Sequence, residues 1–410
     1  MKPMGPIPPA FAGRQVLTIA GHDAEYWIAR AGDTPLFVYD LALIAARVAE
    51  VRAALPDRID LHYAIKANPL PALLAAISPL VDGLDVASGG ELAKALEVKD
   101  AAAISFAGPG KRDDELEAAI VAGATLNLES EGEGRRALAI GHRLGIAPRV
   151  AVRVNPDFEL RGSGMRMGGR ASPFGVDADR AAILVRDLIA NGADWHGFHI
   201  YTGSQALDAE AIAEMQAATL ALADRLSDEA GAVPPLVNLG GGFGIPYFPG
   251  DTPVDLPAVG TALGEALTST RLASGPTRFA IELGRYLVGE AGVYLTRVVD
   301  VKQSQGETFV VVDGGLHHQL AASGNFGTVV RRNYPVANAA KLGADPTGTV
   351  SVVGSLCTPL DRLADRVSFP DTAVGDVVAI FLAGAYGATA SPSAFLGHPA
   401  ARELLIMPQT

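Results

Sequence analysis

The chain has 410 residues, 49% of them hydrophobic and 19% charged, which is typical of a soluble globular protein with two or three domains, or with one barrel and a smaller domain. The formal net charge of −12 argues against nucleic acid and anionic membranes as general partners. A single cysteine, Cys357, excludes an intrachain disulfide and fits a reducing compartment.

The amino-terminal region has no recognisable targeting segment. Residues 1–13 contain Pro3, Pro8 and Pro9 and lack the apolar stretch of a signal peptide, and no apolar run in the chain approaches membrane-spanning length. We therefore expect a cytoplasmic protein. Residues 14–33 are expected to supply one or two strands.

From Thr34 onward, short apolar runs alternate with alanine- and leucine-rich stretches of helical character, such as Glu91–Val98, Glu115–Ala122 and Ala211–Ser227. Strands that alternate with helices in this way predict an α/β fold, a (β/α)8 TIM-like barrel over residues 34–284, with a doubly wound sheet as the alternative. The predicted strands are Leu61–Ile65, Gly83–Ala87, Ala103–Ala107, Thr125–Leu128, Val150–Val154, Gly197–Tyr201, Leu236–Leu239 and Phe279–Leu283.

After about residue 285 the pattern changes to β-rich segments that are separated by turn residues. This change predicts a separate all-β domain, a β-sandwich or β-barrel, formed by residues 285–410 together with residues 1–33. The predicted strands are Val293–Val301, Thr308–Val312, Val350–Val353 and Val377–Leu382.

Two loops carry positive charge in this acidic protein. The loop Arg161–Pro173 is basic and glycine-rich and follows the fifth predicted barrel strand, and Gly327–Gly343 carries Arg331, Arg332 and Lys341. Both loops are candidates for binding an acidic partner, and the alternative is that they are simply solvated.

Lys66 stands at the end of the first predicted barrel strand, where Asn68 and Pro69 turn the chain. A lysine at the end of a buried strand loses hydration, so its pKa is expected to fall. A neutral amine can form a Schiff base with an aldehyde. The alternative is an ordinary surface lysine.

Polar residues and glycines gather at the carboxyl ends of the other predicted strands, which is where a barrel carries its functional residues. The glycine run 240–242 would let backbone N–H groups approach a phosphate, and Glu282 could face a pyridine nitrogen. Together with Lys66 these residues predict a pyridoxal phosphate site. The alternatives are a simple glycine turn and a buried ion pair of Glu282 with Arg285. The other residues at strand ends are Asp85, Ser88, Arg153, Asn155, His199, Tyr201 and Ser204.

The order of several motifs resembles one known family along nearly the whole chain. The chain is similar to the fold-type III pyridoxal phosphate decarboxylases, the ornithine/diaminopimelate/arginine decarboxylase group. Within that group it most resembles the exosortase-system-associated branch, through "MRMGGRASPFGVD" and "SPSAFLGHPA". The other motifs are "HYAIKANP", "GLDVASGGEL", "RVNP", "GFHIYTGSQ", "NLGGGFGIPY", "IELGRY", "VVGSLCTPLD" and "AGAYG".

The resemblance implies an alanine racemase-like barrel that binds pyridoxal 5′-phosphate through an aldimine with Lys66. It also implies that Glu282 is the partner of the pyridine nitrogen. Cys357 would come from the neighbouring subunit of a homodimer and protonate the product carbon. The further implied cofactor contacts are Asp85, Glu91, Arg153, His199, Tyr201, Ser204, Gly240, Gly241, Gly242, Gly284, Arg285 and Tyr386.

The chain departs from the family pattern at the cofactor ring. Relatives usually place a histidine over the ring where this chain has Tyr201, and His199 fills the preceding histidine position. Tyrosine can stack equally well but cannot carry the charge of an imidazole.

The chain also departs at the substrate positions. Diaminopimelate enzymes have an acidic residue at the position of Thr358, and an arginine and a tyrosine at the positions of Ala321 and Asn325. Diaminopimelate is therefore not the expected substrate. Asp361 keeps a diamine possible, and the expected substrate contacts are Thr358, Asp361 and Tyr386.

We therefore expect a pyridoxal phosphate-dependent amino-acid decarboxylase that works as a homodimer, with no nucleic acid, membrane or metal involved. Its substrate could be a free amino acid or one carried by a small carrier protein, as in a relative that acts on a carrier-bound glutamyl group. The alternatives are a racemase of the same fold, which Glu282 disfavours, and a non-catalytic relative, which would not be expected to retain Lys66. His317 and His318 are expected to line a pocket or a turn.

Overall fold

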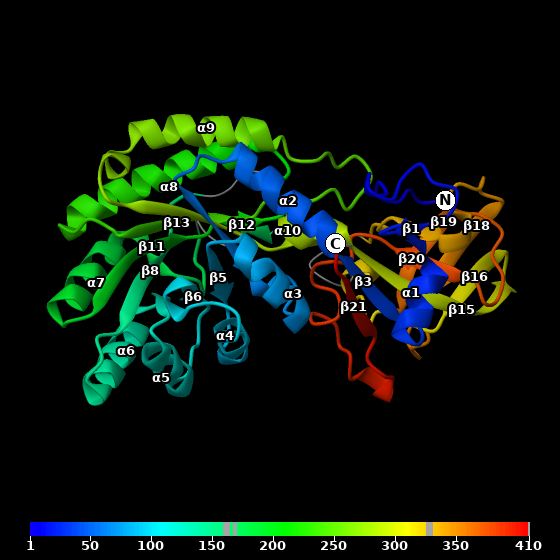
Figure 1. Cartoon of the computed structure of the whole chain (residues 1–410), viewed down its shortest axis with the longest axis horizontal. Helices are drawn as coiled ribbons and strands as arrows, with labels where there is room; N and C mark the ends of the chain where they lie inside the picture. The colour runs from blue at the N-terminus through cyan, green and yellow to red at the C-terminus, as the bar shows by residue number, and fades with distance from the viewer. Residues whose placement is uncertain (159–164, 167–169, 325–330, 409–410) are drawn as a thin grey trace. The chain divides into compact units, whose positions relative to one another are not determined.

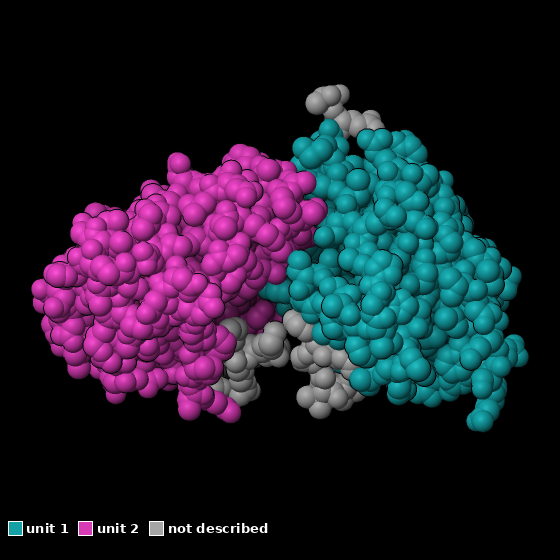
Figure 2. Space-filling view, turned by 90° about the horizontal axis from the view of Figure 1, so that it is seen from below, with its two compact units in different colours: residues 1–46, 245–253, 285–410 teal, residues 47–244, 254–284 magenta. Residues whose placement is uncertain are grey.

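A computed structural model describes residues 1–158, 165–166, 170–324 and 331–408 of the chain. The chain divides into two compact units (Figure 2). The barrel unit comprises residues 47–244 and 254–284, and the β unit comprises residues 1–46, 245–253 and 285–410. Among the described residues, no helix combines the length and the apolar character that a membrane span requires.

The predicted barrel is confirmed. Within the described residues, eight parallel strands close on themselves, because β8 pairs with β7 as well as β11 and β14 pairs with β4 (Figure 1). Each strand is buried along most of its length, as expected for a sheet that is covered by helices. The strands in order around the barrel are β4 (Ile59–Ala64), β5 (Gly83–Val86), β6 (Ile104–Phe106), β7 (Thr125–Leu128), β8 (Arg149–Asn155), β11 (Asp194–Ile200), β13 (Leu236–Gly241) and β14 (Arg278–Leu283).

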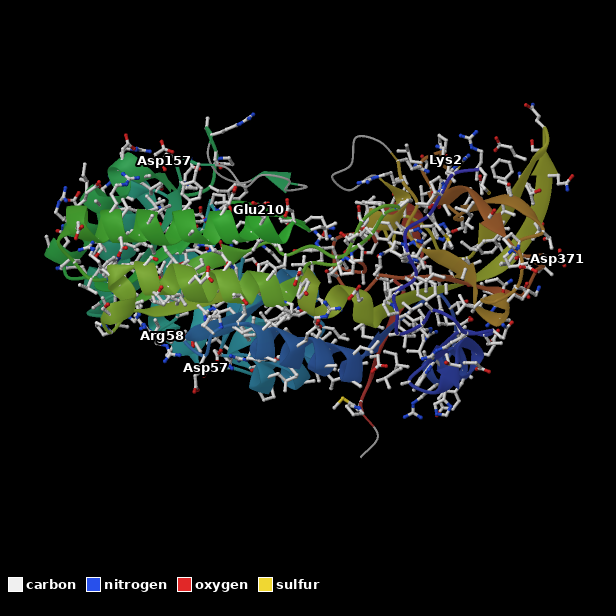
Figure 3. All side chains as sticks on the ribbon, turned by 90° about the horizontal axis from the view of Figure 1, so that it is seen from above. Lys2, Asp57, Arg58, Asp157, Glu210 and Asp371 are labelled. Atoms are coloured by element: carbon white, nitrogen blue, oxygen red, sulfur yellow. The ribbon has the colours of Figure 1, made fainter. Side chains whose placement is uncertain are left out.

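Helices surround the strands, and local sequence signals set their ends. Ser130 caps α6 by accepting a hydrogen bond from the N–H of Glu133, and Gly145 ends the helix in the left-handed conformation, with φ +69°. Figure 3 labels Asp57 and Arg58, two exposed residues of the turn that leads into β4. The helices between barrel strands are α3 (Pro71–Ile77), α4 (Gly89–Leu96), α5 (Asp113–Ala122), α6 (Glu131–Leu144), α7 (Ala178–Ala190), α8 (Ala209–Ala230) and α9 (Leu256–Ser269), and α2 (Leu41–Ala54) precedes β4.

The β unit is built around the long strand β15, which pairs with β16, β20 and β3. The four predicted segments all carry strands, and the all-β prediction is confirmed at the level of fold class. The sheet is formed by β15 (Gly292–Ser304), β16 (Glu307–Val312), β17 (Val336–Asn338), β18 (Gly348–Val353), β19 (Arg362–Phe369) and β20 (Val377–Ile380), with β3 (Leu36–Asp40) and β21 (Arg402–Ile406) joined at β15.

The boundary between the units differs from the expected one at residue 34. Strand β3 was expected within the barrel region, but it pairs antiparallel with β15 and parallel with β21, so residues 34–46 group with the β unit. Residues 14–33 form the short hairpin β1 (Thr18–Ile19) and β2 (His22–Asp23) and also helix α1 (Ala24–Ala31), which the sequence analysis did not predict. Asp23 caps this helix by accepting a hydrogen bond from the N–H of Tyr26.

Candidate active site

Lys66 follows β4 in a single 3-10 turn, Ile65–Ala67. Its two neighbours are buried, whereas Lys66 itself is exposed, so the expected desolvation of this lysine is not observed. The reason is local: the strand ends at Ala64, and Lys66 lies beyond the last inward-facing strand residue. Its Nζ atom lies 5.8 Å from the centroid of the Tyr201 ring.

Glu282 on β14 is a buried carboxylate with two side-chain partners. Its Oε2 atom lies 3.0 Å from Nε2 of His199 and accepts a hydrogen bond of 3.2 Å from Nδ2 of Asn238. Burial raises the pKa of Glu282, but the charge and hydrogen bond of His199 and the charges of Lys66 and Arg153 lower it to about 2. Glu282 is therefore ionised near neutral pH.

Asn238 also fixes the glycine turn at the end of β13, because its Oδ1 atom accepts a 2.8 Å hydrogen bond from the N–H of Gly240. Gly240 and Gly242 have φ angles of +73° and +81°. A Cβ atom on Gly242 would lie 2.1 Å from the carbonyl oxygen of Gly203, and one on Gly241 would lie 1.8 Å from that of Glu282. The turn therefore requires glycine at these positions.

Arg153 on β8 is held by Glu129, which follows β7. Arg153 Nη1 donates a 2.8 Å hydrogen bond to Oε1 of Glu129, and its guanidinium lies 4.9 Å from the centroid of the Phe174 ring. Glu129 also accepts hydrogen bonds from the N–H groups of Gly108 and Gly175. One carboxylate thus ties together the segments that follow β6, β7 and β8.

Asp85 and Glu91 lie on adjoining parts of the same β5–α4 segment. Asp85 is buried, and its Oδ2 atom lies 3.3 Å from Nδ1 of His62. Glu91 accepts a 2.7 Å hydrogen bond from the N–H of Ala87. Burial raises the pKa of Glu91, and the nearby charge of Lys66 opposes this rise.

Within the β unit, Arg285 and a group of tyrosines pack together. Arg285 Nη1 donates a 3.1 Å hydrogen bond to Oη of Tyr247, and its guanidinium lies 4.8 Å from the centroid of the Tyr386 ring. Burial raises the pKa of Tyr247, so this hydroxyl stays neutral. Tyr386 has a φ angle of +55°, which is uncommon for a residue with a side chain and is found at functional sites.

The remaining candidate residues of the β unit have different environments. Cys357 is exposed. Thr358 Oγ1 accepts a hydrogen bond from the N–H of Leu360. Asp361 is 3% exposed, and both of its carboxylate oxygens accept backbone hydrogen bonds, from Leu316 and Leu356. Asp361 therefore holds two loops together and does not present an open carboxylate to a substrate.

Some of the expected positions lie outside the described residues. These are Asn325 and most of the basic loop that begins at Arg161. In the second basic loop, Arg331 is half-buried and donates to the carbonyl oxygens of Arg362 and Leu360, and Lys341 is paired with Asp376. Arg332 is exposed and lies 3.8 Å from the centroid of the Phe248 ring.

The two adjacent histidines are buried in the turn after β16. His318 is hydrogen-bonded to Oη of Tyr294 at 3.0 Å and to the carbonyl oxygen of Pro399 at 2.8 Å. The rings of His317 and His318 pack at a tilt of 45°, with their centroids 3.8 Å apart, and burial lowers the pKa of His317 to about 4.

Sequence reasoning missed three residues that organise the barrel unit: His62, Glu129 and Asn238. Each lies on or directly after a barrel strand and contacts a residue that was identified. His62 lies 3.3 Å from Asp85, Asn238 binds Gly240 and Glu282, and Glu129 pairs with Arg153 from the neighbouring strand. These contacts, and not a sequence pattern, distinguish the three residues from other polar residues of the barrel.

Comparison with known proteins agrees with this arrangement. A family profile described as "Pyridoxal-dependent decarboxylase, pyridoxal binding domain" matches residues 41–289. The chain is 36% identical to the L-glutamyl-[BtrI acyl-carrier protein] decarboxylase of Niallia circulans, over 91% of this chain and 89% of that protein. It is 34% identical to a diaminopimelate decarboxylase of Neisseria meningitidis, over 88% and 87% of the two chains.

A solved structure shows the same fold. The diaminopimelate decarboxylase of M. jannaschii in co-complex with L-lysine superposes with a TM-score of 0.86 at 26% identity. The match covers 96% of this chain and 92% of that one.

Proposed function

This chain belongs to the pyridoxal-dependent decarboxylases, which are carboxy-lyases that use pyridoxal 5′-phosphate, and we propose that it decarboxylates an amino acid bound next to Lys66. The observation that carries the proposal is the ionised Glu282, which His199 and Asn238 hold close to Lys66. A permanent carboxylate at this place can stabilise a positive charge on a pyridine nitrogen, which is what an electron-accepting cofactor requires.

The described residues fit the cofactor on two independent grounds. The glycine turn 240–242 leaves backbone in place of side chains, as a phosphate cradle requires. Among the described residues, Nδ1 of His199 and the carboxylate oxygens of Asp85 are buried without a hydrogen-bond partner, so polar groups remain available for a polar ring.

We assign the cofactor contacts as follows. Lys66 would hold the cofactor covalently, Glu282 would face the ring nitrogen, and Tyr201 would cover the ring face. The phosphate would be bound by Ser204, Gly240, Gly241, Gly242, Gly284, Arg285 and Tyr386, and the ring surroundings would be completed by Asp85, Glu91, Arg153 and His199.

The reaction then follows from what each residue holds. These residues would hold pyridoxal phosphate, which would supply an electron sink for the pair left on the α-carbon when the carboxylate departs as CO₂. Lys66 would hold the cofactor and, with the substrate bound, would hold a proton at its Nζ atom within the site. Cys357, contributed by the partner subunit of a homodimer, is the proposed second proton donor.

For the substrate, we propose an amino acid carried as a thioester on a small acidic carrier protein. The relative from Niallia circulans, by its name, acts on a glutamyl group on a carrier protein. Thr358 and the buried Ala321 offer no charge to a charged distal group of a substrate. Arg332 is exposed, whereas Arg331 is held by backbone carbonyls, so Arg332 is the residue of this loop best placed to meet a carrier.

The test is a screen for CO₂ release from free and carrier-bound amino acids, followed by Arg332→Glu. With a carrier-bound substrate, the reversal should raise KM about tenfold, while kcat for a truncated thioester stays unchanged. Lys302→Glu, on the exposed part of β15, is the matched control and should change neither value. Efficient turnover of free lysine, ornithine or diaminopimelate that ignores Arg332→Glu would show that the substrate is free.

A further inference from the structure

The interior of the barrel is incompletely filled and contains several polar side chains. Most TIM barrels fill this space with layers of branched apolar side chains. Here a cavity of about 310 Å³ opens at the amino-terminal ends of the strands, within the barrel unit. The residues that line this cavity include His62, Ser105, Asn127, Ala151 and Asn238.

The cavity is suited to hold water. Its volume of about 310 Å³ is many times the ~10–15 Å³ that one water molecule requires, and His62, Ser105, Asn127 and Asn238 supply polar groups to its lining. At its outer end, Arg278 forms an ion pair with Asp60, and the side chain of Arg278 is 69% exposed. Arg58, labelled in Figure 3, is exposed and directly precedes β4. Solvent therefore reaches the mouth of the cavity.

His62 lies at the inner end of the cavity. In register, it is opposite Gly83 on one neighbouring strand and Glu282 on the other. A Cβ atom on Gly83 would lie 2.6 Å from Nε2 of His62, so the ring occupies space that a glycine leaves open. On its other side, Nδ1 of His62 lies 3.3 Å from Asp85 Oδ2.

The charges around His62 come from several elements. Asp85 and Asp82 belong to the β5 segment, Glu282 to β14, and Asp60 to β4 itself. Burial lowers the pKa of His62, but the charge of Asp85, which lies 3.3 Å away, and the charges of Asp60 and Glu282 outweigh burial and raise it. His62 can thus hold a proton near neutral pH and exchange it.

Decarboxylation consumes such a proton. The bond between the α-carbon and the carboxylate breaks, CO₂ leaves, and the remaining electron pair forms a C–H bond with one proton from solvent. Asp85 pairs with Ala64, two residues before Lys66, and Glu282 is close enough for the charge of Lys66 to lower its pKa. The inner end of the cavity is therefore next to the proposed reaction site.

Building on the proposed decarboxylation, we propose that the cavity and His62 form a proton-entry route from solvent at the amino-terminal end of the barrel to Asp85 beside the reaction site. His62 is the relay residue. A proton enters through cavity water, passes to the His62 ring, and moves to the Asp85 carboxylate 3.3 Å away, so the site is supplied while substrate occupies the other end of the barrel.

The first test needs no turnover. The cofactor-free protein is incubated in D₂O, and mass spectrometry measures the rate at which each histidine ring exchanges its C2–H for deuterium. His62 should exchange on the timescale of a solvated histidine. Ala151→Leu, which fills the cavity, should slow this exchange at least ~10-fold without affecting the exposed His142 on α6. Exchange of His62 as slow as that of the fully buried His317, or no response to Ala151→Leu, would overturn the route.

The second test uses turnover. His62→Gln should lower kcat at least ~10-fold with an unchanged KM and unchanged cofactor absorbance, and added imidazole should restore the rate. His142→Gln is the matched control and should behave as wild type. An unchanged kcat, or a loss that imidazole does not restore, would show that His62 has only a structural role. If wild-type protein decarboxylates nothing, the proposed function fails, and the exchange experiment alone decides whether the route exists.

Discussion

At the scale of single residues, the barrel unit keeps charges inside by giving each one specific partners. Glu282 is 7% exposed and remains ionised because His199 and Asn238 contact it. Arg153 is 5% exposed and is paired with Glu129. Burying an unpaired charge costs several kcal/mol, so removing one partner should affect stability as well as chemistry.

The pKa of Glu282 gives a prediction with a definite sign. Its folded-state pKa of about 2 lies below the value of 4.5 expected in the unfolded chain, so its ionised form stabilises the fold above pH 4.5. This stabilisation, of about 3 kcal/mol at most, should disappear as pH falls towards 2. The pH dependence of wild-type stability should therefore be steeper between pH 5 and pH 2 than that of Glu282→Gln.

Urea unfolding at several pH values measures this difference. Glu265→Gln, an exposed carboxylate on α9, is the control and should leave the pH dependence unchanged. Parallel curves for wild type and Glu282→Gln below pH 5 would mean that Glu282 is not ionised in the folded protein.

Individual residues of the site differ in how far they could be predicted from the sequence. Lys66, Tyr201 and Glu282 could be selected from the sequence because strand ends and motifs point to them. The exposure of Lys66 could not be predicted from the sequence, because it depends on the 3-10 turn Ile65–Ala67, which follows the strand. Asn238 and Glu129 could not be ranked above other polar residues until their hydrogen bonds were known.

At the scale of elements, the turn after β13 is the most constrained part of the site. Asn238, on the strand, binds both Glu282 and the first glycine of the turn. The side chain of Asn238 thus links the strand, the Glu282 carboxylate and the glycine run through hydrogen bonds. Displacing the turn should therefore disturb cofactor binding before it disturbs the barrel.

Gly242→Ala tests this view of the turn. The new Cβ atom would lie 2.1 Å from the carbonyl oxygen of Gly203, at a φ angle of +81° that alanine rarely adopts. We expect a loss of about 1–3 kcal/mol of stability from strain and at least a tenfold weaker affinity for pyridoxal phosphate, measured by absorbance titration. Gly231→Ala, at φ +67° with no atom within 4 Å of the new Cβ, is the control for strain alone. Equal cofactor affinity in the two variants would mean that the glycine turn does not bind the cofactor.

The elements themselves were largely predictable. Each barrel strand is a run of apolar residues followed by a helix, so a local pattern identified all eight. Elements of the described β unit that were not predicted include α1, β17, β19 and β21. Strand β21 has only five residues and pairs with β3, more than 360 positions earlier in the chain. A pairing between such distant segments cannot be predicted from the local sequence pattern.

At the scale of the whole molecule, neither unit is a continuous segment of chain. The barrel unit is interrupted by residues 245–253 of the β unit, and the chain returns to the β unit at Arg285, directly after Gly284. Gly284 and Arg285, two of the proposed phosphate contacts, are adjacent in sequence but belong to different units. Cys357, the proposed proton donor, belongs to the β unit, and Lys66 belongs to the barrel unit.

A complementation experiment tests whether the proposed site takes Cys357 from a partner subunit. Lys66→Ala and Cys357→Ala should each be inactive, and mixed dimers should contain one site with both native residues. Mixing the two variants under conditions of subunit exchange should therefore restore partial activity, measured as CO₂ release. Mixing each variant with itself is the control. If exchange is demonstrated by mass and no activity returns, each site is built from one chain.

We propose that Lys66 carries the cofactor. Lys111, also in the barrel unit, is an alternative attachment site that must be tested against it. Lys111 is 4% exposed, and burial lowers its pKa, as a Schiff-base lysine requires. Its ammonium, however, already donates hydrogen bonds to Glu133 and to the carbonyl oxygens of Gly108 and Asn127. Lys66 has no comparable burial, but it lies beside Tyr201 and near Glu282.

The deciding measurement is mass spectrometry of the protein after loading with pyridoxal phosphate, borohydride reduction and proteolysis. We predict that the peptide containing Lys66 carries the reduced cofactor, that the peptide containing Lys111 does not, and that Lys66→Ala abolishes the modification in a folded protein. A cofactor found on Lys111 or any other lysine, or a native protein with no covalently attached cofactor, would contradict it.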